Sequence, residues 1–141
     1  MTDEPYVWCI VANVVDERPY GPGGAETRRG MKIFRAGAKL YVAEGFGGDG
    51  WEVVTVVGQP RSSPRFVAAN VRTEHLTNWR VHAVYSPAAH RQIALVRRGF
   101  AGFWLRTEAP FDSEEYRDAL IDVAENFREA AELRRAQRPG D

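Results

Sequence analysis

Apolar residues in the first part of the chain come in short runs that are separated by polar turns. Between Phe66 and Tyr85 the sequence FVAANVRTEHLTNWRVHAVY holds two apolar runs joined by a short polar stretch that contains Leu76. Runs of this length, rich in β-branched and aromatic residues, predict strands. The stretch between them predicts a single tight helical turn. Together they predict two strands of a small β-barrel, with the turn plugging one end.

The same pattern predicts further strands upstream. A long apolar run covers residues 6–15, and shorter runs follow at 31–34, 38–43 and 51–57. Residues 16–30 read DERPYGPGGAETRRG, with two prolines, four glycines and charges of both signs. Such a composition predicts one long exposed loop or an irregular hairpin. A loop of this length in a small domain is commonly functional.

The strand after this loop contains the pattern F-x-x-G-x-K-x-Y, formed by Phe34, Gly37, Lys39 and Tyr41. A first strand, a long charged loop, this strand, a glycine loop, a strand opening on tryptophan and a final pair of strands joined by one helical turn follow in order. This plan resembles the SH3-like barrel. The resemblance implies a mainly β, SH3-like barrel over residues 6–85.

Three segments of the amino-acid sequence carry a second resemblance. The segments WCIVANVVDERPYGPGG, RRGMKIFRAGAKLYV and LTNWRVHAVYSP resemble a family of small, mostly uncharacterised bacterial proteins. The resemblance brings no reaction with it. The barrel architecture is equally silent on activity, because it hosts many unrelated functions.

The last third of the chain predicts helices. Ser86 supplies a capping hydroxyl before a proline, and Gly99 follows two arginines, which together predict a short helix over 87–98. Residues 100–105 are apolar and aromatic, which is typical of an additional strand or a packed connection.

A longer helix is predicted from Ser113, with acidic residues in its first turns. Its apolar residues recur at helical spacing and form one stripe: Tyr116, Leu120, Val123, Phe127 and Ala130. Such a stripe must be buried, either on the barrel or against a second copy in a homodimer. We therefore expect one α+β domain over 1–141, in which 86–141 form a helical extension; monomer and homodimer both remain open.

Length and composition fit a soluble globular protein. The chain has 141 residues, of which 44% are hydrophobic and 27% charged. No apolar run is long enough to span a bilayer, and no signal-peptide pattern opens the chain. These features predict a cytoplasmic protein without a membrane partner.

The charges are unevenly placed although they sum to zero. Residues 53–106 contain eight arginines and one acid, a net charge of +7, whereas residues 107–141 contain ten acids and five arginines, a net charge of −5. The two regions can neutralise each other through an internal contact, or they can present faces of opposite sign. Packing of the long helix on the barrel would bring the acidic tail to the basic middle.

No motif predicts a catalytic, metal or cofactor site. The single cysteine, Cys9, lies in an apolar run and is expected to be a buried thiol. His75, His82 and His90 lack the spacing of a zinc-ligand pair. Glycine-rich residues 45–50 precede a strand, whereas a phosphate-binding loop leads into a helix. We predict no cofactor and no catalysis, and keep an enzyme as an alternative because active sites also assemble from distant residues.

Three binding modes remain. Acidic residues of the long loop beside Trp51 could take a proline-rich peptide, as SH3 domains do. A nucleic acid could bind an arginine face, for which the candidates are Arg61, Arg65, Arg72, Arg80, Arg97 and Arg98. A net charge of zero and only two lysines argue against that mode. A folded protein partner is the third mode, since arginine and tryptophan dominate interface energetics.

These observations predict a non-catalytic protein–protein interaction module. By analogy with small bacterial proteins that carry charged faces and no catalytic set, an immunity or inhibitor role is the form we expect. The nucleic-acid mode is the first alternative and an enzyme the second. The predicted partner-binding residues lie on the long loop, on two strands and at the corner before the last strand: Asp16, Glu17, Arg28, Arg29, Trp51, Arg72, Asn78, Trp79 and Arg80.

Overall fold

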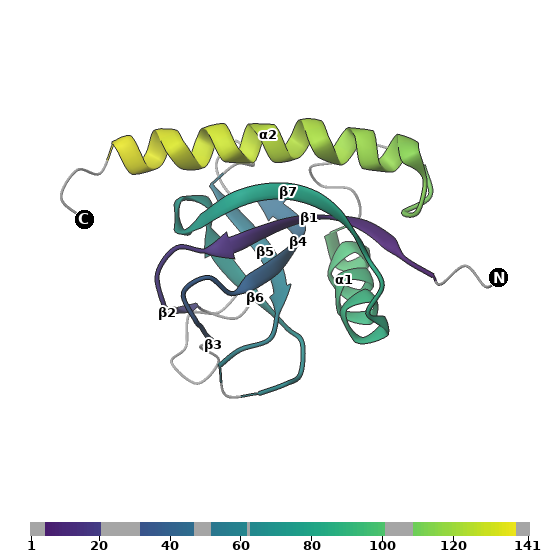
Figure 1. Ribbon diagram of the computed structural model, residues 1–141, viewed down its shortest axis with the longest axis horizontal. Coiled ribbons are helices and arrows are strands. Elements are labelled where there is room, and N and C mark those ends of the chain that lie inside the picture. The colour runs from purple at the N-terminus through teal and green to yellow at the C-terminus, as the bar shows by residue number, and fades with distance from the viewer. Residues whose placement is uncertain (1–4, 21–31, 47–51, 62, 101–108, 138–141) are drawn as a thin grey trace.

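The computed structural model describes residues 5–20, 32–46, 52–61, 63–100 and 109–137. In these ranges the chain forms an α+β fold, with an antiparallel sheet followed by two helices (Figure 1). The strands are β1 (Val7–Val14), β2 (Arg18–Tyr20), β3 (Lys32–Phe34), β4 (Lys39–Phe46), β5 (Val53–Gly58), β6 (Val67–Arg72) and β7 (Leu76–Val84). The helices are the single 3-10 turn η2 (Thr73–His75), α1 (Pro87–Phe100) and α2 (Glu114–Ala136).

The main sheet has five strands in the order β6-β5-β4-β1-β7, and each neighbouring pair is antiparallel. The predicted helical turn is present as η2 and joins β6 to β7, which lie at opposite edges of the sheet. Among the described residues the sheet is open, so the predicted closure into a barrel is not found. Closure requires hydrogen bonding between the edge strands. The periodicity that predicts a strand carries no information on that pairing.

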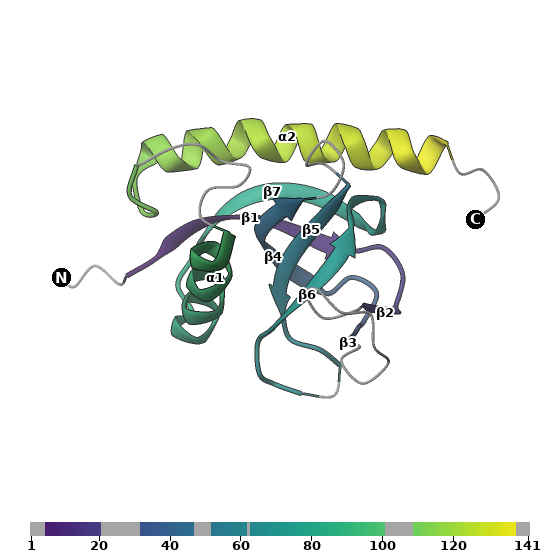
Figure 2. The same ribbon diagram turned by 180° about the vertical axis from the view of Figure 1, so that it is seen from behind.

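Both faces of the sheet are covered, which explains why its strands read as nearly continuous apolar runs. Ile10 and Ala12 of β1 join a core beneath α2, whereas Cys9 and Val11 point to the opposite face and join a second core with α1. Figure 1 shows α2 lying across the sheet, and Figure 2 shows α1 from behind, where it packs near β4. The two helices therefore cover opposite faces.

The long helix buries nearly the stripe that its sequence predicts. Its buried residues are Tyr116, Leu120, Val123, Ala124, Phe127 and Ala131. Ala131 replaces the predicted Ala130, because a helix of 3.6 residues per turn carries the contact line gradually around its axis. Ser113 caps the first turn as predicted, and its Oγ accepts a hydrogen bond from the Tyr116 amide at 3.2 Å. The stripe packs against β1, β7 and η2 of the same chain.

Of the two alternatives predicted for 16–30, the described residues form the hairpin, in which Arg18 of β2 lies opposite Phe34 of β3; residues 21–31 lie outside the described ranges. Strand β4 continues to Phe46, beyond the predicted end at 43. Helix α1 continues to Phe100, so Gly99 lies inside the helix instead of ending it. The rest of the segment predicted at 100–105 lies outside the described residues.

Replacing Gly58 by alanine is expected to lower the free energy of unfolding by about 1–3 kcal/mol. An added Cβ would lie 2.3 Å from Leu40 Cδ2 and 3.2 Å from Phe34 Cε1. Both neighbours are fully buried, so they cannot yield without disturbing the core. Urea unfolding measures the change. An unaltered midpoint would mean that the Leu40 side chain has room to rotate away.

Candidate functional site

Aromatic and arginine side chains gather where the start of β1, the end of β7, helix α1 and the start of α2 meet. We call this group the aromatic–arginine cluster; its members are Tyr6, Trp8, Tyr85, Arg97, Phe111, Tyr116 and Arg117. Tyr85 and Phe111 remain 52% and 43% exposed. The cluster thus presents large rings at the surface while its arginines are held by neighbouring groups.

Strand pairing brings the first three aromatic residues together. Val7 of β1 lies opposite Val84 of β7, so the residues just outside this pair, Tyr6 and Tyr85, become neighbours. Their ring centroids lie 5.4 Å apart, and the ring of Tyr6 meets Trp8 edge-on at 5.7 Å. These separations are those of favourable aromatic pairs.

The start of α2 is fastened to the start of β1. The Trp8 amide donates to the Phe111 carbonyl at 2.9 Å, and the Tyr6 hydroxyl donates to the Asp112 carbonyl at 3.0 Å. These bonds place the Phe111 ring 5.1 Å from Tyr116. Residues far apart in sequence therefore form one surface whose geometry the main chain fixes.

Two arginines stack on the rings of this cluster. The Arg117 guanidinium lies 5.5 Å from the Trp8 ring, and its Nη2 pairs with Asp118 at 3.1 Å. Arg97 is only 7% exposed and lies 5.1 Å from the Phe111 ring. Its Nη2 donates to the Trp8 carbonyl at 3.3 Å. Both contacts have cation–π geometry.

Two acidic groups beside Arg97, the Cys9 thiol and the Tyr116 phenol, are uncharged near neutral pH. Burial raises the pKa of the Cys9 thiol, an effect that the Arg97 charge opposes only in part. Burial likewise raises the pKa of Tyr116. Both acids therefore stay protonated, and the buried guanidinium is left without a counterion from either of them.

Cys9 is expected to resist thiol reagents in the folded protein. Because the side chain is fully buried and its raised pKa disfavours the thiolate, labelling at pH 8 should be on the order of a hundredfold slower than in urea. A fast labelling rate of the native protein would contradict the burial of Cys9.

The raised pKa of Cys9 also predicts a change of stability with pH. Because the folded-state pKa lies above the ordinary 9.0, the free energy of unfolding should fall as the pH rises past 9.0.

The predicted corner before the last strand contains a hydrogen-bonded network. Asn78 has a left-handed backbone, with φ 58°, which is uncommon outside glycine. Arg80 Nη1 donates to Asn13 Oδ1 at 2.6 Å and to the Asn78 carbonyl at 2.8 Å. The Asn78 side-chain amide also donates to Asn13 Oδ1, at 3.1 Å. Asn78 and Arg80 thus come together as predicted residues, with Asn13 as an unpredicted third member.

Trp79 points away from that corner. Its ring stacks on Phe127 of α2 with the centroids 5.3 Å apart, and it packs against the core beneath the helix. This placement makes the partly buried ring a contact between strand and helix.

Three other predicted partner-binding residues lie in the described ranges: Asp16, Glu17 and Arg72. The ion pairs of Glu17 and Arg72 are not with the corner. Asp16 and Glu17 are exposed, and Glu17 pairs with Arg61 at 3.0 Å. Arg72 pairs with the buried Glu74 at 2.9 Å. Arg28, Arg29 and Trp51 lie outside the described residues.

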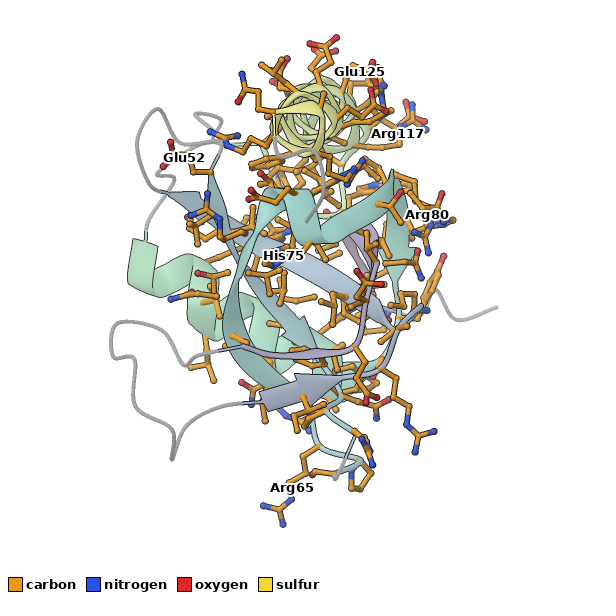
Figure 3. The ribbon with its side chains drawn as sticks, turned by 90° about the vertical axis from the view of Figure 1, so that its left-hand side faces the viewer. Glu52, Arg65, His75, Arg80, Arg117 and Glu125 are labelled. Carbon is orange, nitrogen blue, oxygen red and sulfur yellow. The ribbon has the colours of Figure 1, made fainter. Side chains whose placement is uncertain are left out.

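The acids of α2 do not meet the basic middle of the chain. In the ranges that the structure describes, the ion pairs of these acids are formed within the helix, where Arg128 binds Glu125 and Glu132. It is instead the arginines near the end of α2 that reach the sheet: Arg134 pairs with Glu52 at 3.4 Å, and Arg135 donates to the Leu76 carbonyl at 2.9 Å. Figure 3 shows Glu125 directed away from the sheet.

Two classes of site are not found within the described part of the chain. No cluster of three or more histidine, cysteine or acidic residues could hold a metal ion there. None of the helices described is both long and apolar enough to cross a membrane.

Comparison with known proteins finds no match. No protein-family model, no curated protein and no solved structure matches the chain. The resemblance to a small bacterial family therefore stays a prediction.

Sequence reasoning missed the aromatic–arginine cluster. In the sequence, Tyr6 and Trp8 belong to the start of the first predicted strand, and Tyr85 ends the last one. Arg97 is one of several arginines predicted for a surface. One signal could have indicated the cluster: a tyrosine opens the first predicted strand and another ends the last one. That signal needs the register of β1 on β7, which the sequence pattern does not supply.

Proposed function

We propose that this protein is a non-catalytic protein-interaction module whose partner binds at the aromatic–arginine cluster and along the free edge of β7. The observation that carries the proposal is the cluster itself. Tryptophan, tyrosine and arginine are the residue types that dominate binding energy at protein interfaces. Here they are brought together at a surface and held in place by strand pairing and by hydrogen bonds from β1 to the α2 start.

Arg80 in the middle of β7 and Tyr85 just beyond its end fit within one interface. Arg80 and Tyr85 are five residues apart on or beside this edge strand, a span of roughly 17 Å at 3.3–3.4 Å per residue. A standard interface covers about 800 Å² on each partner, which accommodates that span. Figure 3 places Arg80 and Arg117 on the same side of the molecule. Arg80 would then lie at the rim and the aromatic rings at the centre.

The arrangement of the arginines favours a protein over a nucleic acid. Of the arginines that could form a nucleic-acid face, Arg97 is buried, and Arg61 and Arg72 pair with acids. Arg65 lies at the end of the molecule remote from α2 (Figure 3). Phosphate binding draws its strength from several free cations on one surface. Such a group is not assembled by the arginines just named.

We further propose that the open sheet is related to the SH3-like barrel. The support is the order β6-β5-β4-β1-β7 and the single helical turn between the last two strands, which agree with the order of elements inferred from the sequence.

The proposed interface predicts that the partner makes contact outside the loop 16–30, because the aromatic–arginine cluster lies at the opposite end of β1.

Replacing Tyr85 by alanine is expected to reduce capture of the partner by at least tenfold, because a centrally placed aromatic anchor is worth about 2 kcal/mol or more. The measurement uses the tagged protein in native lysate treated with nuclease, and quantifies the protein that elutes in near-equal amount. Arg80→Ala should reduce capture less, as a residue at the rim.

Leu95→Ala is the matched control, because Leu95 is 55% exposed but lies on α1 outside the cluster. Equal capture by the Tyr85 and Leu95 variants would remove the cluster from the interface. Capture that disappears on nuclease treatment would favour the nucleic-acid alternative instead.

A further inference from the structure

Arg97 is a buried cation with unused hydrogen-bond donors. Its Nε and Nη1 are shielded from solvent, and neither has a hydrogen-bond partner among the residues that the structure describes. Only Nη2 is engaged, with the Trp8 carbonyl at 3.3 Å and the Cys9 sulfur at 3.5 Å. A buried donor without a partner is costly, and more so when the group is charged. A hydrogen-bond acceptor placed beside Nε and Nη1 would therefore lower the free energy of the site.

No acid among the described residues supplies that acceptor. Arg97 takes part in none of the ion pairs formed among them. The buried carboxylate of Glu44 in β4 acts electrostatically on Tyr116, and its Oε1 accepts a hydrogen bond from the Gly45 amide at 3.0 Å. The neighbouring thiol of Cys9 and phenol of Tyr116 are neutral. Within the described part of the chain, Nε and Nη1 of Arg97 therefore have no carboxylate in hydrogen-bond contact.

The cover over Arg97 is a side chain that can turn. Phe111 lies over the guanidinium at 5.1 Å and is 43% exposed, so one side of this covering ring faces solvent. Side-chain rotations of this kind are common when interfaces form. The Trp8 Nε1 is a further buried donor that has no hydrogen-bond partner among the described residues. Arg117 lies over the Trp8 ring, and its charge is paired with Asp118.

We propose that Arg97 receives the side-chain carboxylate of an acidic residue of the protein partner, with Phe111 turning aside to admit it. This inference rests on the proposed function, of which it specifies the chemistry. A planar carboxylate matches the guanidinium fork, and its flat shape fits between aromatic rings. The acid of the partner then supplies a charged acceptor for Nε and Nη1.

The test uses two blocked amino acids that differ only in charge. N-acetyl glutamate amide and N-acetyl glutamine amide are each titrated into the full chain at constant ionic strength, and the Arg97 Nε–H resonance is followed by NMR. We expect a saturable shift with the glutamate probe, with a dissociation constant on the order of 1–100 mM. The glutamine probe should give none.

Three variants sharpen the result. Arg97→Met should abolish the response of the Phe111 ring signals to the glutamate probe. Arg97→Lys keeps the charge but loses the fork, and should weaken binding by roughly tenfold. Phe111→Ala removes the cover, so its Arg97 signal should respond at equal or lower probe concentration; this variant keeps the test valid if the Arg97 variants do not fold.

An unshifted Arg97 resonance in both the natural chain and the Phe111 variant would overturn the inference, and so would equal shifts with the two probes. Its failure is separable from failure of the proposed function. If Tyr85→Ala loses the partner while Arg97 ignores the probe, the interface stands and the carboxylate contact falls. If Arg97 binds the probe while Tyr85→Ala keeps the partner, the anion site stands and the proposed interface falls.

Discussion

Replacing Phe127 by alanine is expected to lower the free energy of unfolding by about 3–5 kcal/mol, the range of large-to-small changes of a buried aromatic residue. The ring is fully buried and stacks on Trp79, and it belongs to the core that joins α2 to the sheet. Its loss would leave a cavity where helix and strand meet. Because domains of this size are stable by only about 5–15 kcal/mol, the variant should unfold at a much lower urea concentration.

Leu133→Ala is the control on the same helix. Leu133 is 61% exposed, so its replacement should change the free energy of unfolding by no more than about 0.5 kcal/mol. If both variants behaved alike, α2 would not be an integral part of the folded domain. The stacking of Trp79 on Phe127 would then be too weak to hold the helix.

Replacing Arg97 by methionine is expected to raise the free energy of unfolding by about 1–3 kcal/mol. Methionine fills a similar volume with flexible apolar atoms and removes a buried charge whose Nε and Nη1 have no hydrogen-bond partner in the described ranges. The Trp8 carbonyl loses one hydrogen bond, which offsets part of the gain. Urea unfolding at pH 7 measures the balance.

Arg117→Met provides the comparison for that result. The Arg117 side chain is 36% exposed and stacks on Trp8 as Arg97 stacks on Phe111, but it is solvated and paired with Asp118. Its replacement should change stability by less than about 1 kcal/mol. If Arg97→Met proved strongly destabilising, Arg97 would be a structural residue, and its contacts with Trp8 and the rings would outweigh the cost of its burial.

A gain in stability on replacing Arg97 by methionine would match the proposed role of the cluster. Binding sites retain groups that destabilise the free protein, because the partner satisfies them in the complex. The same variant that stabilises the fold should then weaken the contact with an acidic partner. A residue that serves only the fold would show the opposite relation between stability and binding.

Local patterns were enough to predict most elements of this fold. The period of two in β5, the apolar run of β1 and the helical spacing of α2 depend only on neighbouring residues. The cap at Ser113 and the single turn at Thr73–His75 were likewise readable, since they depend on a few adjacent side chains. The ends of helices were less certain, as Gly99 shows, because packing can carry a helix through a glycine.

Tertiary structure alone decided whether the sheet closes, which charges meet and where the surface rings lie. The open sheet depends on hydrogen bonding between strands, and the Arg134–Glu52 pair depends on where α2 ends over the sheet. The cluster depends on the register of β1 against β7 and on the bond from the Trp8 amide to the Phe111 carbonyl. Sequence periodicity assigns each residue to an element and a face. It cannot assign neighbours from another element, because those are fixed by contacts between residues as distant in sequence as Trp8 and Phe111.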